Sequence, residues 1–310
     1  MAHADRLPTT LLEAIRYFAD EDRCFEFVKD LRWEDGEVTC PRCKADKPYY
    51  LATRRVWKCR SCRKQFSLKS GTIFEGSPLG FDKWLPAIWL IANSKNGISS
   101  HELGRALGVT QKSAWFMNHR IRLAMESGSL EKLVGTIEVD ETYVGGVARN
   151  MHKNARARKI HGTGGIDKVA IQGAKQRGGE FRASVIHGTN AGAMQANIYA
   201  WIEVGSAVYT DQHNGYRGLD RGFAHKTVNH SVEYVSGDVH INGCENFWSL
   251  FKRAWRGTYT HMDPQHAHRY LAERLFSFNE RENSDLGRMS SVVSCVVGKR
   301  VTYAALTSAN

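Results

Sequence analysis

The sequence predicts a mixed α/β fold that follows a small cysteine-rich module and a group of helices. Three patterns lead to this prediction: four cysteines in two close pairs, then apolar residues at helical spacing, then strands that alternate with helices. The chain has 310 residues, which is enough for two or three domains and one sizeable core. Its contents of 42% hydrophobic and 10% aromatic residues are those of a globular protein and exclude a disordered one.

The composition favours a polyanionic partner. The formal net charge is +11 and the isoelectric point is about 9.3, so nucleic acid is the partner that the charge indicates. No run of about 18 apolar residues is present, and residues 1–8 carry no apolar segment of the secretory type. We therefore expect a cytoplasmic protein with reduced thiols and no membrane contact.

Four of the seven cysteines have the spacing of a zinc site. Cys40 and Cys43 form one C-x2-C pair, and Cys59 and Cys62 form a second pair, with fifteen residues between the two pairs. Two disulfides are the alternative, which a reducing compartment disfavours. Because the protein fills all four positions, the zinc is expected to be structural. The remaining cysteines have no partner spacing and are expected to be core thiols: Cys24, Cys244 and Cys295.

The N-terminal third is expected to combine helices with this ribbon. Residues 10–31 have apolar residues at helical spacing, with a break near residues 20–22. The ribbon is expected over residues 38–68, with short strands at 49–51 and 56–58. Basic and aromatic residues between its two cysteine pairs fit a ribbon that lies on DNA.

The next segment is typical of a helix-turn-helix. A first helix is expected over residues 81–91, Ser99 and Glu102 resemble a capping box, and a turn at 108–110 precedes a helix over 111–122. A plain helical hairpin that packs on the next domain is the alternative. If the segment binds DNA, the last helix offers these polar residues to a groove: Gln111, Lys112, Ser113, Asn118, His119 and Arg120.

A sheet begins at about residue 133, where polar and apolar residues alternate. A glycine pair, Gly145 and Gly146, follows the first strand, and the basic stretch 149–168 lacks apolar periodicity and is expected to be a loop. The later elements come in the order of an RNase H-like fold, in which a mixed sheet has helices against it. They are a hairpin of strands 169–173 and 181–186, a helix 191–204, strands 207–211 and 226–228, and helices 243–255 and 263–279.

Three acidic residues, at two strand ends and on a later helix, are candidates for a metal site. Asp140 and Asp211 each end a strand, and Glu245 lies on a later helix. Either aspartate alone is typical of a turn, but three acids so placed can converge and hold two divalent metals for attack on a phosphodiester. Glu245 and Lys252 are seven residues apart and share a helix face, although a solvated, salt-bridged helix has the same pattern.

Two other polar residues near the start of this helix are candidates for the site. Asn242 can offer an amide oxygen to a metal, and Mg²⁺ needs only two or three protein oxygens because it keeps its waters. The histidines match no strong zinc spacing, and His240 is the best candidate among them for a role in the site. The C-terminal residues 290–310 have apolar pieces but no site chemistry.

The motifs together resemble a known family, the DDE transposases of the bacterial insertion-sequence family fifteen-ninety-five. The resemblance extends from about residue 10 to residue 282. It rests on R-W-E-D-G before Cys40, on W-K-C-R-S-C through Cys62, on E-V-D-E-T-Y-V-G-G around Asp140, and on Y-T-D at Asp211. It ends with H-x-N-x-x-E-x-x-W-x-x-x-K-R, which contains Glu245, and with G-T-Y at 257–259.

The resemblance implies a transposase that cuts and joins terminal inverted repeats. Asp140 and Asp211 match the two aspartates of the family, whereas the third position is open between Asn242 and Glu245. The interval of 34 residues from Asp211, as in many DDE enzymes, favours Glu245. Family members tend to have a basic residue where this chain has Ser277, which puts a secondary contact in doubt.

The expected cofactors are two Mg²⁺ (or Mn²⁺) ions at Asp140, Asp211 and Glu245, besides the structural Zn²⁺. One metal would activate water or a DNA 3′-hydroxyl, and the other would stabilise the leaving oxygen. Lys252 and Arg253 are expected to contact DNA. The expected partners are the terminal repeats, target DNA and further copies of the chain, in a nucleoid-associated bacterial protein.

The expected domains are a zinc-ribbon region over 1–72, a helix-turn-helix over 73–130, a catalytic domain over 131–285 and a tail over 286–310. Two other functions remain open. A regulator built from the ribbon and the helix-turn-helix would bind DNA without cleaving it. A nuclease of the RNase H type would cut branched or hybrid substrates.

Overall fold

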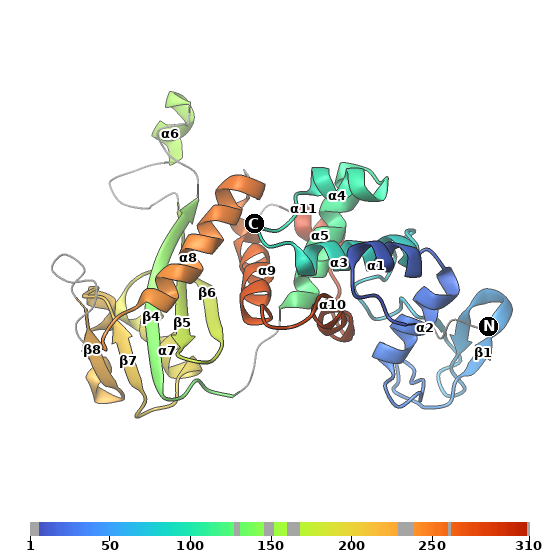
Figure 1. Ribbon diagram of the computed structural model, residues 1–310, viewed down its shortest axis with the longest axis horizontal. Helices are drawn as coiled ribbons and strands as arrows, with labels where there is room; N and C mark the ends of the chain where they lie inside the picture. The colour runs from blue at the N-terminus through green and yellow to red at the C-terminus, as the bar shows by residue number, and fades with distance from the viewer. Residues whose placement is uncertain are drawn as a thin grey trace. The chain divides into compact units, whose positions relative to one another are not determined.

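The computed structural model describes residues 6–126, 131–145, 152–159, 168–228, 238–259 and 262–308. Its contacts divide the chain into two compact units, which are considered separately. Unit 1 contains residues 1–127 and 280–310, and unit 2 contains residues 128–279. Figure 1 shows the elements of both units. None of the helices in the described parts is long and apolar enough to cross a bilayer.

Unit 1 joins the ribbon to a group of helices. The ribbon is an antiparallel sheet with the strand order β1-β2-β3, and both strands expected from the sequence are present in it. Trp57 of β2 is 5% exposed and stacks between Phe25 of α2 and Phe66 of β3. The elements are α1 (Leu11–Tyr17), α2 (Glu21–Arg32), β1 (Tyr49–Leu51), β2 (Val56–Lys58), β3 (Gln65–Ser67), α3 (Phe81–Asn93), α4 (Ser100–Leu107), α5 (Gln111–Met125), α10 (Asp285–Ser294) and α11 (Tyr303–Thr307).

The expected helix-turn-helix geometry is present in α4 and α5. Ser99 accepts from the N–H of Glu102, whose side chain accepts from the N–H of Ser99, so the capping box is complete. Gly108 ends α4 with φ of 66°, a left-handed conformation that glycine adopts without a Cβ penalty. Thr110 then caps α5.

Residues 280–310 pack within unit 1. Lys299 Nζ donates to the carbonyl oxygens of Ala124 and Glu126 at the end of α5. Farther along, the ring of Tyr303 lies 4.6 Å from Lys112 Nζ and makes edge contacts with Trp115 and Phe116. The C-terminal segment therefore lies along α5 and covers part of its side.

Unit 2 is a five-stranded mixed sheet with helices on both faces. The strand order is β6-β5-β4-β7-β8, in which β4, β5 and β6 are antiparallel and β4, β7 and β8 are parallel. This order confirms the RNase H-like prediction. The elements are β4 (Thr136–Gly145), α6 (Lys153–Lys159), β5 (Lys168–Gln176), β6 (Phe181–Ile186), α7 (Ala191–Trp201), β7 (Ala207–Thr210), β8 (Ala224–Thr227), α8 (Asn242–Ala254), a π-helix (Trp255–Tyr259), a 3-10 turn (Pro264–His266) and α9 (Ala267–Asn279).

The two faces of this sheet have separate cores. Ile137 and Val139 of β4 pack with Met194 and Ile198 of α7. On the other face, α8 and α9 pack with Phe181 of β6 and with residues of β4 and β5. Because side chains alternate along a strand, Glu138 and Asp140 point to the face that α8 covers.

One expectation for this region is wrong. The basic stretch after β4 was expected to be a loop, yet residues Lys153–Lys159 form α6. Its alanine, lysine and arginine residues have high helix propensity, so a short helix forms without the apolar stripe on which the prediction depended. Residues 146–151, including Gly146, and residues 160–167 lie outside the described residues.

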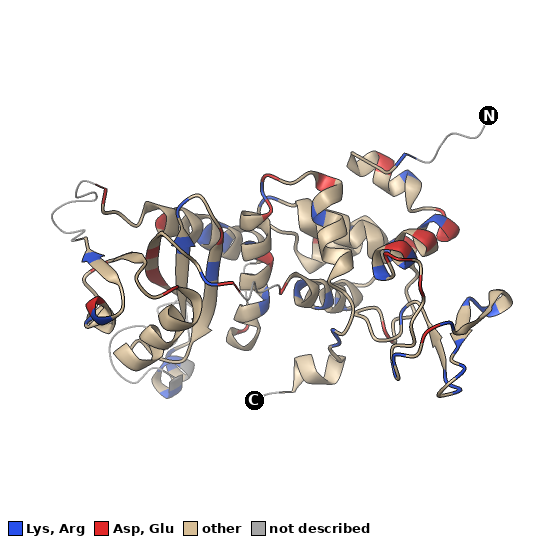
Figure 2. Ribbon diagram, turned by 90° about the horizontal axis from the view of Figure 1, so that it is seen from below, with Lys and Arg blue, Asp and Glu red and all other residues tan. Residues whose placement is uncertain are grey.

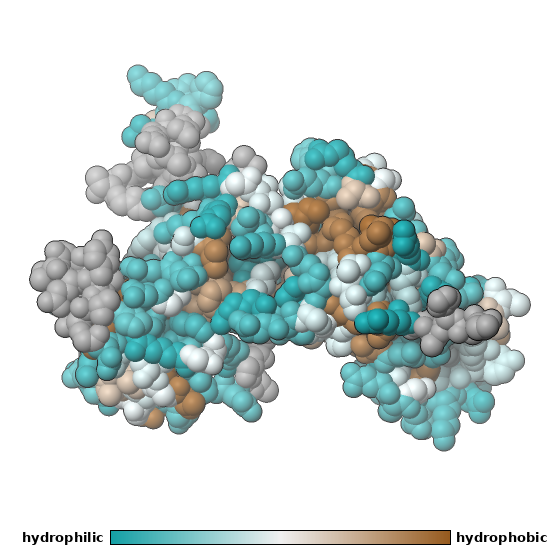
Figure 3. Space-filling view, viewed as in Figure 1, coloured by the Kyte–Doolittle hydropathy of each residue, from teal (hydrophilic) through white to brown (hydrophobic). Residues whose placement is uncertain are grey.

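The face drawn in Figure 3 is mainly hydrophilic, with apolar areas in both units, including some over the helices of unit 1. Leu11, Leu12 and Ile15 of α1 are among the exposed apolar residues there. Figure 2 colours the positions of Lys and Arg along the backbone, and they occur in both units, including the zinc ribbon.

Candidate zinc and catalytic sites

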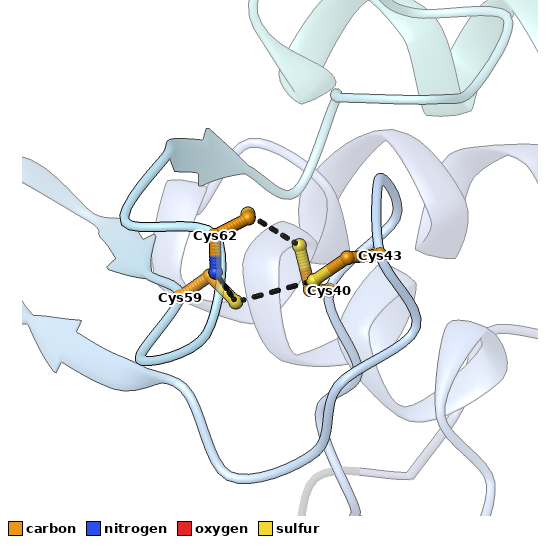
Figure 4. Close-up of side chains that lie close together, drawn as sticks. All are labelled: Cys40, Cys43, Cys59 and Cys62. Atoms are coloured by element: carbon orange, nitrogen blue, oxygen red, sulfur yellow. Dashed lines mark hydrogen bonds between the residues drawn. The ribbon is translucent and has the colours of Figure 1, made fainter.

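The four predicted zinc ligands lie together in the ribbon (Figure 4). Their sulfur atoms all lie within 4.8 Å of one another, with 3.8 Å between Cys40 and Cys62 and 3.5 Å between Cys43 and Cys59. A tetrahedral zinc with Zn–S bonds of about 2.3 Å needs sulfur separations of about 3.8 Å. The donor set and its spacing therefore fit a structural zinc ion.

The two cysteine pairs have the same backbone design. The N–H of Cys40 donates to the oxygen of Ala45, and the N–H of Cys59 donates to the oxygen of Lys64. The residue after each pair, Lys44 or Arg63, has a positive φ of 62° or 59°. The backbone N–H of Ala45 and the thiol of Cys59 lower the pKa of Cys43 to about 6, which favours the thiolate that zinc needs.

In unit 2 the strand register brings the two candidate aspartates side by side. β4 pairs with β7 in parallel, with Glu138 opposite Tyr209. Continuing this register by two residues places Asp140 beside Asp211, which directly follows β7. Residues in register on parallel neighbours point to the same face, so both carboxylates lie on the side of the sheet that α8 covers.

The surroundings of Asp140 disfavour the ionised form of its carboxyl group. Burial, with the charges of Glu141 and Asp211, raises its pKa to about 7, although the indole N–H of Trp248 opposes this shift. Burial also raises the pKa of Glu141, and Tyr216 donates to its Oε2 at 2.6 Å. A divalent cation would compensate this concentration of buried negative charge. Carboxylate oxygens are hard donors, which Mg²⁺ prefers.

Helix α8 is tied to Asp140 through Trp248. The Trp248 Nε1 atom donates to Asp140 Oδ2 at 3.0 Å. Gly173, which pairs with Asp140 across β4 and β5, leaves room for this contact, since a Cβ there would lie 2.7 Å from the Trp248 ring and 2.6 Å from Phe181. A side chain on β5 at this position would displace the indole.

The third candidate acid lies on the same helix. Glu245 is exposed and precedes Trp248 by three residues, and Lys252 follows Trp248 by four residues. At about 100° per residue, Glu245 and Lys252 share the helix face on the Trp248 side, two turns apart, whereas Asn242 is turned farther away. Burial lowers the pKa of Lys252, and Asp140 opposes this shift, which indicates that the two are near.

The carboxylate oxygens of Asp140, Asp211 and Glu245 do not all lie within metal-binding distance of one another. Among the described residues, only the four cysteines form a set of three or more possible metal ligands whose atoms all lie within 4.8 Å. The charge of Asp211 acts on Asp140, whereas the contact of α8 with Asp140 is made by Trp248, three residues after Glu245.

Several residues of this region were not predicted. Lys168 and Arg256 are close enough to lower the pKa of Lys252, so they add positive charge beside the acids. Arg253 is exposed. The hydrogen bond from Trp248 to Asp140 has no sequence signal. The position of Glu141 directly after Asp140 is the sequence signal that could have identified it as part of the site.

Of the candidate DNA-contacting residues on α5, only those in its first turn are exposed. Gln111 and Lys112 are exposed. The prediction for Arg120 is wrong, because its side chain is 5% exposed and its guanidinium donates to the oxygen of Ile73 at 2.8 Å. Asn118 and His119 are also buried, since α5 is packed on most sides after its second turn.

Comparison with known proteins identifies two domains. Residues 132–279 match the model of the ISXO2-like transposase domain, and residues 19–65 match that of the transposase zinc-ribbon domain. The chain is also similar to an uncharacterized protein in the transposable element ISH50 of Halobacterium salinarum. The two are 29% identical over 252 residues, which cover 77% of this chain and 84% of that protein.

The ribbon and the mixed sheet, with these matches, define the class as a transposase with an N-terminal zinc ribbon. Both matched models are those of the insertion-sequence family IS1595, and the chain belongs to this family.

Proposed function

We propose that the protein cuts and joins DNA at the ends of an insertion sequence, with Asp140, Asp211 and Glu245 as its catalytic carboxylates. The observation that carries this proposal is the parallel register that sets Asp140 beside Asp211 under a helix tied to Asp140. Glu245 and Lys252 lie seven residues apart on this helix, and in the proposal both face the two aspartates.

In this proposal the three carboxylates hold Mg²⁺ or Mn²⁺. Two such ions would supply activation of the attacking hydroxyl and stabilisation of the leaving oxygen in an in-line displacement. Lys252 orients a phosphate beside the acids, and the positive charges of Lys168, Arg253 and Arg256 hold the strand there. The exposed basic residues of the ribbon and the first turn of α5 bind the transposon end.

Several parts of the proposal rest on family membership. They are the recognition of terminal inverted repeats, the transfer to target DNA and the assembly of several copies on the paired ends. The domain roles are also part of it, with DNA binding by residues 1–72 and 73–130 and catalysis by residues 131–285.

The test measures strand cleavage of labelled duplexes that carry the ends of the flanking element, with Mg²⁺. We expect cleavage at the repeat boundary by the wild type and a loss of at least about 100-fold in Asp211→Asn, because even changes behind a metal ligand cost 10–100-fold. The exposed Asp220 gives a matched control, and Asp220→Asn is expected to cleave normally.

The third acid is tested in the same assay. Glu245→Gln should lose cleavage as Asp211→Asn does, whereas Asn242→Ala should retain most of it. The opposite result would assign the third position to Asn242. DNA binding without cleavage by the wild type would instead favour the non-catalytic regulator, and cleavage of branched duplexes without repeats would favour the nuclease.

A further inference from the structure

Glu138 is a buried acid for which the proposed chemistry has no use. Its side chain is 2% exposed, and it lies two residues before Asp140 on the same face of β4. A carboxylate this deeply buried needs partners that repay its lost hydration.

Three groups from separate parts of unit 2 surround this carboxylate. Arg177 Nε donates to Oε1 at 2.9 Å, and His240 Nδ1 lies 3.2 Å from the same oxygen. The backbone N–H of Gly243 donates to Oε2 at 2.6 Å. Glu138 also acts through its backbone, because the thiol of Cys244 donates to its carbonyl oxygen at 3.2 Å.

Arg177 extends these contacts to the segment before α8. Its Nη2 atom donates to the carbonyl oxygens of Asp238 and His240, at 3.0 and 3.3 Å. Its guanidinium lies over the ring of Tyr209 on β7, 5.1 Å from the centroid. Glu138 and Arg177 therefore join β4, β7 and the chain entering α8.

Glu138 also serves as the N-terminal cap of α8. The residue at the cap position, Ile241, makes no side-chain capping bond, so a first-turn N–H of the helix would lack a partner from its own segment. The carboxylate of Glu138 accepts from Gly243 instead, and its charge suits the positive end of the helix. Gly243 permits this approach, since a Cβ there would lie 2.7 Å from Glu138 Oε2.

Two hydrogen bonds join β4 and α8, and their spacing along the strand is similar to their spacing along the helix. Gly243 donates to Glu138, and Trp248 donates to Asp140. Two residues of strand span about 7 Å and five residues of helix span about 7.5 Å. Because both contacts are met at once, α8 can neither slide along β4 nor turn about its axis without breaking one of them.

We propose that Glu138 is a positioning residue that sets the height and rotation of α8, so that Glu245 faces Asp140 and Asp211. This inference rests on the proposed function, because it gives Glu138 a role in the assembly of that same metal site. Glu138 does not touch metal or DNA and acts through the start of the helix.

The test compares full-length Glu138→Gln and Gly243→Ala with the wild type. The control is Glu203→Gln, which changes an exposed acid of the same unit. Mn²⁺ binding to the free protein is measured first, with Asp211→Asn to identify the ions bound at the candidate site. Cleavage is then measured over a range of Mg²⁺ concentrations, together with DNA affinity and thermal unfolding.

We expect both variants to bind Mn²⁺ about 10–100-fold more weakly, which is the usual effect of changing a residue behind a ligand. Cleavage should fall by a similar factor at low Mg²⁺ and recover in part at high Mg²⁺, with DNA affinity unchanged. A purely structural role would lower the unfolding temperature without this shift in metal dependence, and that result would overturn the proposal.

Unchanged Mn²⁺ affinity and cleavage in both variants would also overturn it. If Glu138→Gln fails to fold, Gly243→Ala decides the question, because it disturbs the same contact from the helix side. A wild type that binds Mn²⁺ at Asp211 yet cleaves no DNA would refute the proposed function, and the Mn²⁺ affinities would still decide the role of Glu138. A wild type that binds no Mn²⁺ there would overturn both proposals.

Discussion

At the residue scale, Asp140 combines two properties that usually exclude one another. It is largely buried beside two other carboxyl groups, yet its proposed work requires it to be charged. The rise of its pKa from 3.8 to about 7 corresponds to at most about 4 kcal/mol of folding free energy at high pH. The metal-free protein is therefore destabilised at high pH by an acid whose charge the hydrogen bond from Trp248 compensates only in part.

This property predicts the pH dependence of stability in metal-free protein. The folded state holds a proton on Asp140 that the unfolded state has released between about pH 4 and pH 7, so stability from this group falls as the pH rises through that window. Asp140→Asn should raise the unfolding temperature at pH 8 and should have little effect near pH 4. Calorimetry with chelator checks this, and equal effects at both pH values would contradict it.

Gly173 gives a second prediction at this scale. In Gly173→Ala the new Cβ would meet the rings of Phe181 and Trp248, so the indole must move from Asp140. We expect cleavage to fall by about tenfold or more, in line with changes behind a metal ligand, while DNA affinity is retained. Gly178 on the open hairpin turn has a φ of 72°, and Gly178→Asn, which tolerates that conformation, is the control.

At the element scale, we expect the ribbon to depend on zinc, because it is too small to be stable through its own core. Its strands have three residues each, and its core is largely Trp57 with the aromatic rings around it. Binding of structural zinc contributes about 10–16 kcal/mol in small domains, far more than these contacts.

We therefore predict that the purified protein holds about one zinc ion per chain and that Cys59→Ser loses it. Loss of zinc should release Trp57, which elemental analysis and a red shift of tryptophan fluorescence would report. Cys295→Ser removes a thiol outside the cluster and is expected to retain the metal. Full zinc content in Cys59→Ser would argue against the four-cysteine site.

Elements with strong local signals were predictable from the sequence. The cysteine spacing, the Ser99 capping box and the β5–β6 hairpin all depend on residues close together in the chain. Asp140 and Asp211 could be selected because each ends a run of strand-forming residues, but only the β4–β7 register sets them side by side.

The remaining features depend on distant contacts that leave no periodic signal. Arg120 looked like a groove-facing residue because the sequence does not reveal what packs on α5. Trp248 looked like a core residue because the partner of its N–H is 108 residues away. Glu138 was visible only as part of a motif, since its capping role comes from another element.

At the scale of the whole molecule, the chain leaves unit 1, builds unit 2 and returns to unit 1. Leu306 of α11 is 2% exposed and Met289 of α10 is fully buried, so the returning segment is part of the first unit's core. The basic net charge of +11 is carried by both units, which suits a protein that holds DNA at more than one place.

This organisation predicts that changes near the C-terminus weaken unit 1 selectively. Leu306→Ala should cost about 2–4 kcal/mol in the unfolding of unit 1, as large-to-small core changes do. Hydrogen exchange should show faster exchange in α5 and α11, with β4 and β5 unaffected. Ser308→Ala, at an exposed position of the same segment, is the control. Equal loss of protection in both units would mean that they unfold together.

The return of the chain to unit 1 also determines the order in which the protein is completed during translation. When the ribosome has made residues 128–279, all strands of the mixed sheet are available, but α5 still lacks Lys299 at its end and Tyr303 at its side. Domains generally fold as units during synthesis. The nascent chain therefore finishes the unit that bears the acids before the unit that bears the ribbon and α5, and a premature stop codon after residue 280 leaves the second of these unfinished.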